Sequence, residues 1–130
     1  MIDRALLLRA SDLFNRKLYF ECHDLLEEAW SEAKGEDHDL LQSLIHVSVG
    51  LYHVAAGNHK GAKSLLERGV LGLEAFLPTG VTRAARDGLD LLGLSRQARR
   101  CLEKTERALA GERIDWEVED VPVMRVAALE

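Results

Sequence analysis

The chain has 130 residues, of which 47% are hydrophobic and 30% are charged, and its formal net charge is −5 at pH 7. These values suit one water-soluble domain and argue against a disordered chain, a collagen-like repeat or a membrane protein. The acidic balance disfavours a dedicated nucleic-acid binder, because neutralising phosphates requires a basic surface.

The charges are unevenly distributed along the chain. Residues 1–59 carry 5 Lys/Arg against 10 Asp/Glu, residues 60–113 carry 11 against 7, and residues 114–130 carry 1 against 5. An acidic front and an acidic tail could therefore lie against a basic middle.

The cysteine pattern and the N-terminal charges indicate the compartment. Cys22 and Cys101 are 79 residues apart and belong to no Cys-x-x-Cys motif, so the sequence contains no zinc knuckle, redox motif or disulfide framework. Reduced thiols are the simplest interpretation. Charged residues from Asp3 to Asp12 interrupt the apolar core that a signal peptide requires, so we expect a cytoplasmic protein.

Helical periodicity runs through most of the chain and predicts five helices. They are expected at about Asp3–Arg16, Leu18–Ala33, Leu40–His59, from the Asn58 cap to Leu77 before Pro78, and from Leu91 or Ser95 to Ala110. The third of these contains no Asp, Glu, Lys or Arg, which is typical of the central helix of a bundle. Its polar residues make it unsuitable as a membrane span.

The predicted fold class is all-α, a single-domain antiparallel helical bundle of about five helices with an extended C-terminal tail. Residues 1–113 would form the bundle domain, with a connector at 78–90. Residues 114–130 alternate weakly and include Pro122, which predicts an extended tail packed on the bundle.

A helical wheel of the second predicted helix separates three faces. The core face holds Leu18, Cys22, Leu25 and Ala29, and the solvated face holds Glu21, Asp24, Glu28 and Glu32. Between them lies a stripe of Tyr19, Phe20, His23, Glu27 and Trp30. Because aromatic neighbours lower the local dielectric, His23 and Glu27 are expected to form a poorly hydrated pair.

The third predicted helix supplies a second polar stripe. Gln42, His46, Gly50 and His53 recur at spacings of 4, 4 and 3. A short connection favours antiparallel packing of the second and third helices, which would bring their stripes together. The candidate ligand-pocket residues are Tyr19, His23, Glu27, Trp30, Gln42 and His46.

Three interpretations of this cluster stay open. It is a structural polar network between helices, a small-ligand pocket, or a metal site built from imidazole and carboxylate groups. The stretch His23-Asp24-Leu25-Leu26-Glu27 lacks the second histidine of the zinc-protease motif. The sequence identifies neither a cofactor nor a catalytic residue.

Two stretches carry a resemblance to a known family. They are Phe14-Asn15-Arg16-Lys17-Leu18-Tyr19-Phe20-Glu21-Cys22-His23-Asp24-Leu25-Leu26-Glu27-Glu28-Ala29-Trp30 and Leu41-Gln42-Ser43-Leu44-Ile45-His46. Both resemble the domain of unknown function 309 family, over roughly residues 10–77. The resemblance implies a small all-helical bundle with no established activity. Asp24, Ser43 and His46 depart from its pattern, which tends to have glutamate, glycine and glutamine at these positions.

Three hypotheses for function follow. The first is a non-enzymatic bundle that acts through a small ligand, a protein partner or a homodimer. The second is a metal-assisted, hydrolase-like enzyme that uses His23 and Glu27. The third is a nucleic-acid-associated protein that uses the arginines between residues 83 and 107.

Overall fold

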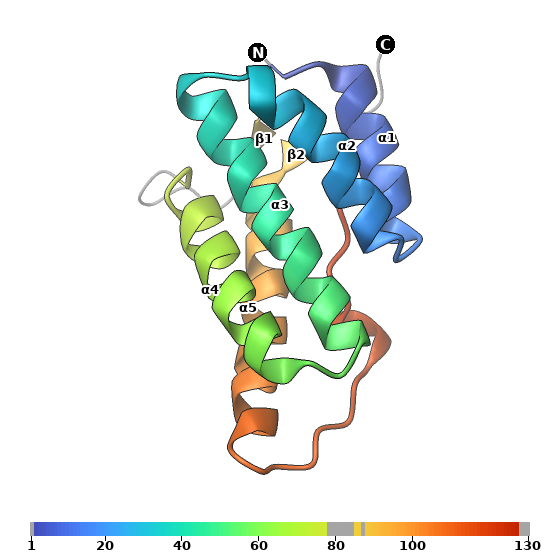
Figure 1. Ribbon diagram of the computed structural model, residues 1–130, viewed down its shortest axis with the longest axis vertical. Helices are drawn as coiled ribbons and strands as arrows, with labels where there is room; N and C mark the ends of the chain where they lie inside the picture. The colour runs from blue at the N-terminus through green and yellow to red at the C-terminus, as the bar shows by residue number, and fades with distance from the viewer. Residues whose placement is uncertain (1, 78–84, 87, 128–130) are drawn as a thin grey trace.

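The computed structural model describes residues 2–77, 85–86 and 88–127, and in these residues it shows a bundle of five α-helices (Figure 1). The predicted all-α fold is therefore confirmed. Two antiparallel strands of two residues each and one 3₁₀ turn complete the described secondary structure. The elements are α1 Arg4–Asn15, α2 Tyr19–Glu32, α3 Gly35–Ala55, α4 His59–Glu74, β1 Ala85–Arg86, β2 Leu89–Asp90, α5 Leu91–Leu109 and η1 Val118–Asp120.

Side-chain caps explain where three of the helices begin. The side chains of Asp3, Asn58 and Asp90 accept hydrogen bonds from backbone amides in the first turns of α1, α4 and α5. Each cap satisfies an amide that lacks a partner within its helix. The Asn58 cap was predicted from the sequence and is confirmed.

The third helix begins five residues earlier than predicted, at Gly35 instead of Leu40. Glu36 and Asp37 occupy its first turn, where carboxylates interact favourably with the helix dipole. The helix ends at Ala55, before Gly57 takes a positive φ of 78°. The predicted stop of the fourth helix, Pro78, lies outside the described residues.

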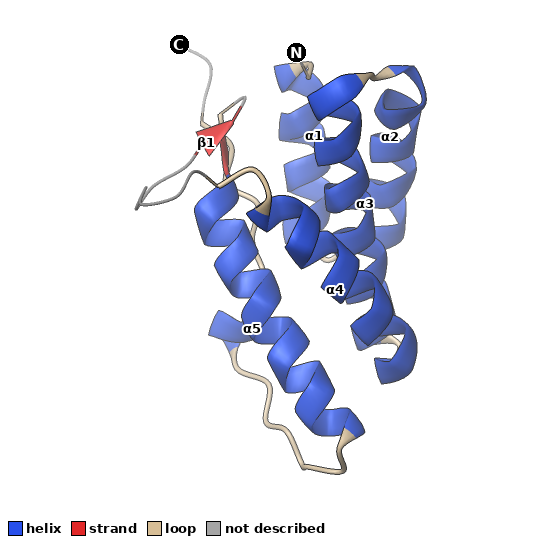
Figure 2. Ribbon diagram, turned by 90° about the vertical axis from the view of Figure 1, so that its left-hand side faces the viewer, coloured by secondary structure: helices blue, strands red, loops and turns tan. Residues whose placement is uncertain are grey.

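Helix α3 lies at the centre of the bundle and contributes the largest group of buried side chains. It packs against α2 on one side and α4 on the other, and α4 in turn contacts α5 (Figure 2). Helices α3 and α4 pack closely at Gly69 because this residue has no β-carbon. A β-carbon at this position would collide with Val47 of α3. The prediction that this helix is the central one is therefore confirmed.

The segment after α5 is extended apart from η1, and it contacts both ends of the helical region. Met124 is buried, and the backbone of Val126 forms a bridge with Leu89 of β2. Asp120 is buried beside α5, where its carboxylate pairs with Lys104 and Arg100. These contacts hold the C-terminal segment against α1, β2 and α5.

Among the described residues, no helix combines the length and the apolar character that crossing a membrane would require.

Candidate functional site

The three faces predicted for α2 are largely present. On the predicted core face, Cys22 and Leu25 are buried, whereas Leu18 and Ala29 are only half-buried; Leu26, which was not assigned to that face, is buried as well. The four acidic residues of the predicted solvated face are all exposed. Tyr19, placed by the helical wheel on the stripe between the core and solvated faces, is part of the core: its ring is buried and packs edge-on against Phe14 at 5.4 Å between centroids. The reason is that Tyr19 begins α2, where the α1–α2 turn brings α1 alongside it.

His23 and Glu27 form the predicted pair, with Nε2 of His23 3.1 Å from a carboxylate oxygen of Glu27. The side chain of His23 is 16% exposed, whereas that of Glu27 is 52% exposed. The expectation of a poorly hydrated pair is therefore wrong.

Ring contacts connect α2 to α3 on this outer side. Phe20 lies 5.2 Å from the ring of His23 and 5.9 Å from that of Tyr52, which stacks on His53 at 5.7 Å. Phe20 is 55% exposed and Tyr52 is 41% exposed. We call the surface formed by Phe20, His23, Tyr52 and His53 the aromatic face.

Trp30 and Gln42 lie nearer the other end of the same two helices. Trp30 is half-buried with its ring 4.7 Å from that of His38, and its indole Nε1 has no acceptor among the described residues. Gln42 is exposed on α3. Among the described residues, no hydrogen bond, ion pair or ring contact joins either residue to His23.

His46 borders α4. It is half-buried, and burial together with the positive charge of Arg68 on α4 lowers its pKa. Gly50 of the same predicted stripe faces Leu66 of α4. The stripe of α3 is thus turned toward α4 and solvent, because the sides of α3 that carry Ser48 and Tyr52 already face α2.

Asp24 joins His23 and Glu27 in a group of three metal-ligand types. One ligand atom from each residue lies within 4.8 Å of the other two, and this is the one such group in the described residues. Nδ1 of His23 is also 3.1 Å from the backbone oxygen of Phe20. Oxygen atoms of Phe20 and Asp24 therefore lie beside Nδ1, and a carboxylate oxygen of Glu27 lies beside Nε2.

The charged residues of helix α2, apart from its histidine, are all acidic. The helix contains five carboxylates and no Lys or Arg, and all five are exposed. The aromatic face therefore adjoins a strongly negative helix surface.

Sequence reasoning missed a hollow of about 280 Å³ beside the C-terminal end of α3. Lys17 and Trp116 line it, as do buried parts of Tyr19, Leu51 and Cys101. An adjacent hollow of about 400 Å³ shares Lys17 and Tyr19. These residues come from distant parts of the chain, so no local pattern could reveal them.

Residues 7–65 match the family model described as Domain of unknown function (DUF309). The resemblance seen in the sequence is thereby confirmed. The matched segment runs from α1 into α4 and includes the His23 group, the aromatic face and Gln42.

The uncharacterized protein YpuF of Bacillus subtilis strain 168 is 38% identical to this chain over 58 residues. The alignment covers 44% of this chain and 33% of that protein, so this chain spans about a third of the relative's length. No solved structure matches the chain significantly. The descriptions of the family and of the relative name no activity, so these comparisons give no support to the hydrolase-like alternative.

Proposed function

We propose that this chain is a binding module whose aromatic face docks a cationic segment of a partner protein. The observation that carries the proposal is the exposed ring pair Phe20–Tyr52, which joins α2 to α3 at 5.9 Å between centroids. Aromatic residues held in place by neighbouring rings are frequent energetic centres of protein interfaces.

The charge of α2 supports a cationic occupant. Five exposed carboxylates and no basic residue lie on the helix that carries Phe20 and His23. An arginine-bearing segment could stack its guanidinium groups on Phe20 or Tyr52 and pair with Asp24 or Glu27. Leu71 of α4 is 58% exposed, and its helix carries basic as well as acidic residues, which makes it a control for an exposed apolar side chain outside the aromatic face.

The test uses a synthetic amphipathic helix of arginine and leucine and its counterpart with glutamate in place of arginine. Amide NMR shifts on titration should concentrate around Phe20 and Tyr52 for the arginine peptide. Phe20→Ala and Tyr52→Ala should each weaken binding about tenfold, whereas Leu71→Ala should not. Affinity should fall as salt rises.

Two results would reject this proposal. One is equal binding of both peptides, or equal sensitivity to Phe20→Ala and Leu71→Ala. The other is a concentration-dependent dimer that Phe20→Ala abolishes, since the occupant would then be a second copy of this chain.

A second candidate function, binding of a transition-metal ion, is favoured by the His23, Asp24 and Glu27 group. In metal sites, a histidine commonly donates from one ring nitrogen to a carbonyl and ligates through the other. Nδ1 of His23 faces the carbonyl of Phe20 and Nε2 faces Glu27. Imidazole and carboxylate ligands suit zinc or nickel, with the remaining positions open to solvent.

The chain contains its own control for this site. His38-Asp39-Leu40-Leu41-Gln42 repeats the spacing of His23-Asp24-Leu25-Leu26-Glu27, with an amide in place of the last carboxylate. Nδ1 of His38 lies 3.6 Å from Asp39. The first copy therefore offers three ligands and the second offers two.

Calorimetric titration of untagged protein with ZnCl₂ tests this candidate. One equivalent should bind, His23→Ala or Glu27→Gln should weaken it at least tenfold, and His38→Ala should leave it unchanged. Gln42→Glu should add a second equivalent. Unchanged zinc binding in the His23→Ala variant would exclude the site.

A further inference from the structure

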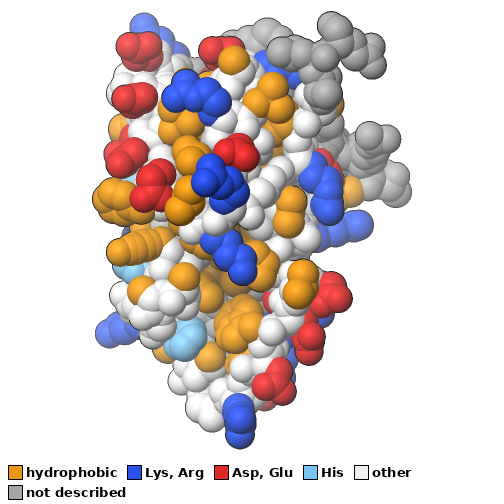
Figure 3. Space-filling model, turned by 90° about the vertical axis from the view of Figure 1, so that its right-hand side faces the viewer, with side chains coloured by type: hydrophobic (Ala, Val, Ile, Leu, Met, Phe, Trp, Pro, Cys, Tyr) orange, Lys and Arg blue, Asp and Glu red, His pale blue; other side chains and the backbone are white. Residues whose placement is uncertain are grey.

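A hollow between the α1–α2 turn, α3, α5 and the C-terminal segment has an apolar lining. Its volume is about 280 Å³, room for about nine water-sized groups. Leu51, Val54, Val121 and Pro122 form much of the wall, and Cys101 lies at the base. Hydrophobic surface is visible on this side of the molecule, next to basic side chains (Figure 3). Apolar walls with few polar groups are typical of small-molecule sites.

Tyr19 gives this hollow a hydrogen-bond donor. The residue is 93% buried, since its relative exposure is 7%, and it lines the hollow. Burial, with smaller contributions from Cys101 and Cys22, raises the pKa of Tyr19 to about 12. The hydroxyl therefore stays protonated at neutral pH and can donate to an acceptor that enters.

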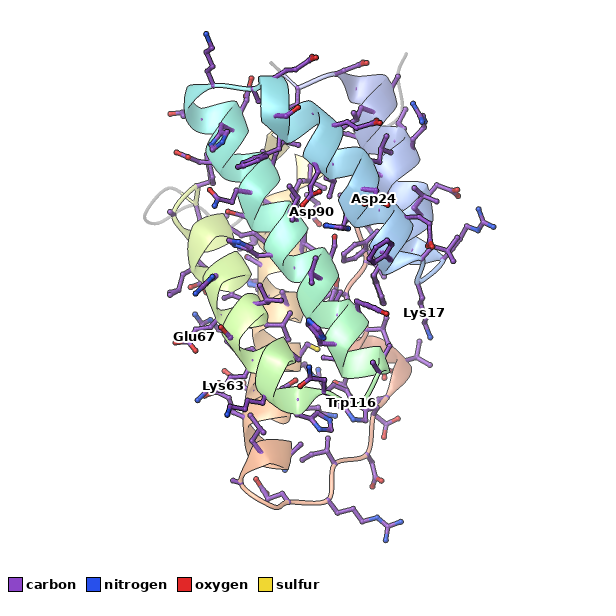
Figure 4. All side chains as sticks on the ribbon, viewed as in Figure 1. Lys17, Asp24, Lys63, Glu67, Asp90 and Trp116 are labelled. Atoms are coloured by element: carbon purple, nitrogen blue, oxygen red, sulfur yellow. The ribbon has the colours of Figure 1, made fainter. Side chains whose placement is uncertain are left out.

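Lys17 places a positive charge at the same hollow. Figure 4 shows Lys17 at the α1–α2 turn and Trp116 on the C-terminal segment, both near the C-terminal end of α3. Lys17 has a positive φ of 64° and is the one residue besides glycine with positive φ in the described part of the chain. It occupies the position after α1 where glycine is preferred, so a lysine side chain is held here at a conformational cost.

One negative charge lies on the wall, and it is already neutralised. The carboxylate of Asp120 pairs with Lys104 and with Arg100 at 2.7 Å. Lys17 has no ion pair among the described residues, so its charge is available to a ligand.

From this arrangement we propose that the hollow binds a medium-chain carboxylic acid, with the chain against Leu51, Val54 and Pro122 and the carboxylate at Lys17 and the hydroxyl of Tyr19. The apolar wall accounts for the chain, and the paired cation and donor account for the anion. This site adjoins the aromatic face, because the neighbouring hollow lined by Phe20 and Tyr52 shares Lys17 and Tyr19, but the proposal does not rest on the proposed function.

The test titrates sodium octanoate, below its micellar concentration, into Trp30→Phe protein so that fluorescence reports on Trp116 alone. Octan-1-ol serves as the same chain without the charge. Octanoate should change the Trp116 emission with saturation and shift the amide signals of Tyr19, Leu51 and Val54. It should bind at least tenfold more tightly than octanol.

Two variants separate the roles of charge and donor. Lys17→Gln keeps the side-chain length, and Tyr19→Phe keeps the packing against Phe14 but removes the hydroxyl. Each should weaken octanoate about tenfold. Lys17→Gln should leave octanol unchanged, and Tyr19→Phe should weaken octanol less than octanoate. Lys63→Gln on α4 is the control and should have no effect, because Figure 4 shows Lys63 on the left of the molecule and Lys17 on the right.

The proposal is overturned by equal affinity for octanoate and octanol, by wild-type octanoate affinity in the Lys17→Gln variant, or by shifts confined to residues outside the hollow. Absence of saturable octanoate binding to the folded protein would overturn it as well.

Discussion

The side-chain amide of Asn15 binds both backbone polar groups of Met124, 109 residues away in sequence. Its Nδ2 donates to the Met124 carbonyl at 2.9 Å, and its Oδ1 accepts from the Met124 amide at 2.8 Å. An amide side chain thus acts here like one residue of a neighbouring β-strand, and it joins the end of α1 to the C-terminal segment.

Asn15→Ala should lower the free energy of unfolding by about 2 kcal/mol, because two hydrogen bonds are lost and the Met124 backbone is left unpaired. Asn15→Asp should be similarly damaging, since a carboxylate cannot donate to the carbonyl. Urea denaturation measures both. Gln42→Ala removes an exposed amide and should cost no more than about 0.5 kcal/mol; equal losses at the two positions would argue against this role of Asn15.

Glu27→Ala should change the free energy of unfolding by less than about 1 kcal/mol, close to the effect of Glu28→Ala. A buried ion pair that loses one partner costs about 3–5 kcal/mol, but Glu27 is 52% exposed, so water can replace it. Thermal denaturation of the two variants provides the comparison. A large loss for Glu27→Ala alone would instead support a structural network.

Asp120 should make stability depend on acid. The hydrogen bond from Lys104, followed by the one from the Glu117 amide, lowers the pKa of its carboxyl. A carboxyl with a lower pKa in the folded state stabilises the protein above its unfolded pKa near 3.8, and this contribution is lost as pH falls through the folded pKa.

Asp120→Asn should therefore cost about 3 kcal/mol at pH 7, and its difference from the wild type should shrink below about pH 4. Urea midpoints at a series of pH values measure both effects. Asp115→Asn, at an exposed position of the same segment, is the matched control. A constant difference between the Asp120→Asn variant and the wild type down to pH 2 would contradict this explanation.

Gly69→Ala should lower the free energy of unfolding by about 2 kcal/mol, although alanine normally favours a helix. The added β-carbon would lie 2.6 Å from Cγ2 and 2.9 Å from the backbone nitrogen of Val47, so α3 and α4 would have to separate. At Gly72 the nearest obstacle is the Ser43 side chain, which can move. Gly72→Ala should cost less and be relieved by Ser43→Ala; calorimetric melting temperatures that rank the two variants in the opposite order would refute the argument.

The helices could be predicted because their buried residues repeat with helical spacing. In addition, Gly57 marks the end of α3 and Asn58 marks the beginning of α4 to within a few residues. The His23–Glu27 contact could be predicted from the same spacing, since the two residues are one turn apart. Local spacing cannot say how a helix is rotated toward its neighbours. The α3 stripe was therefore assigned to the α2 side, whereas Gly50 and His46 face α4.

The hollow at Lys17 and Tyr19 could not be predicted for a related reason. It exists because the chain that follows α5 runs back along the bundle and places Trp116 and Pro122 beside the C-terminal end of α3. One local signal was available: a lysine follows α1 at the position where helices commonly have glycine. Reading that signal requires knowing where α1 ends to within one residue, which periodicity alone does not provide.

The two hydrogen bonds between Asn15 and Met124 can form only late in synthesis of the chain. During translation, at about 5–20 residues per second, roughly 5–20 s separate the synthesis of these two residues. For that interval the end of α1 has no partner for its amide, and the surface that Met124 will cover remains open. A nascent chain that has left the ribosome only as far as α5 would therefore present the surface that Met124 later covers to chaperones.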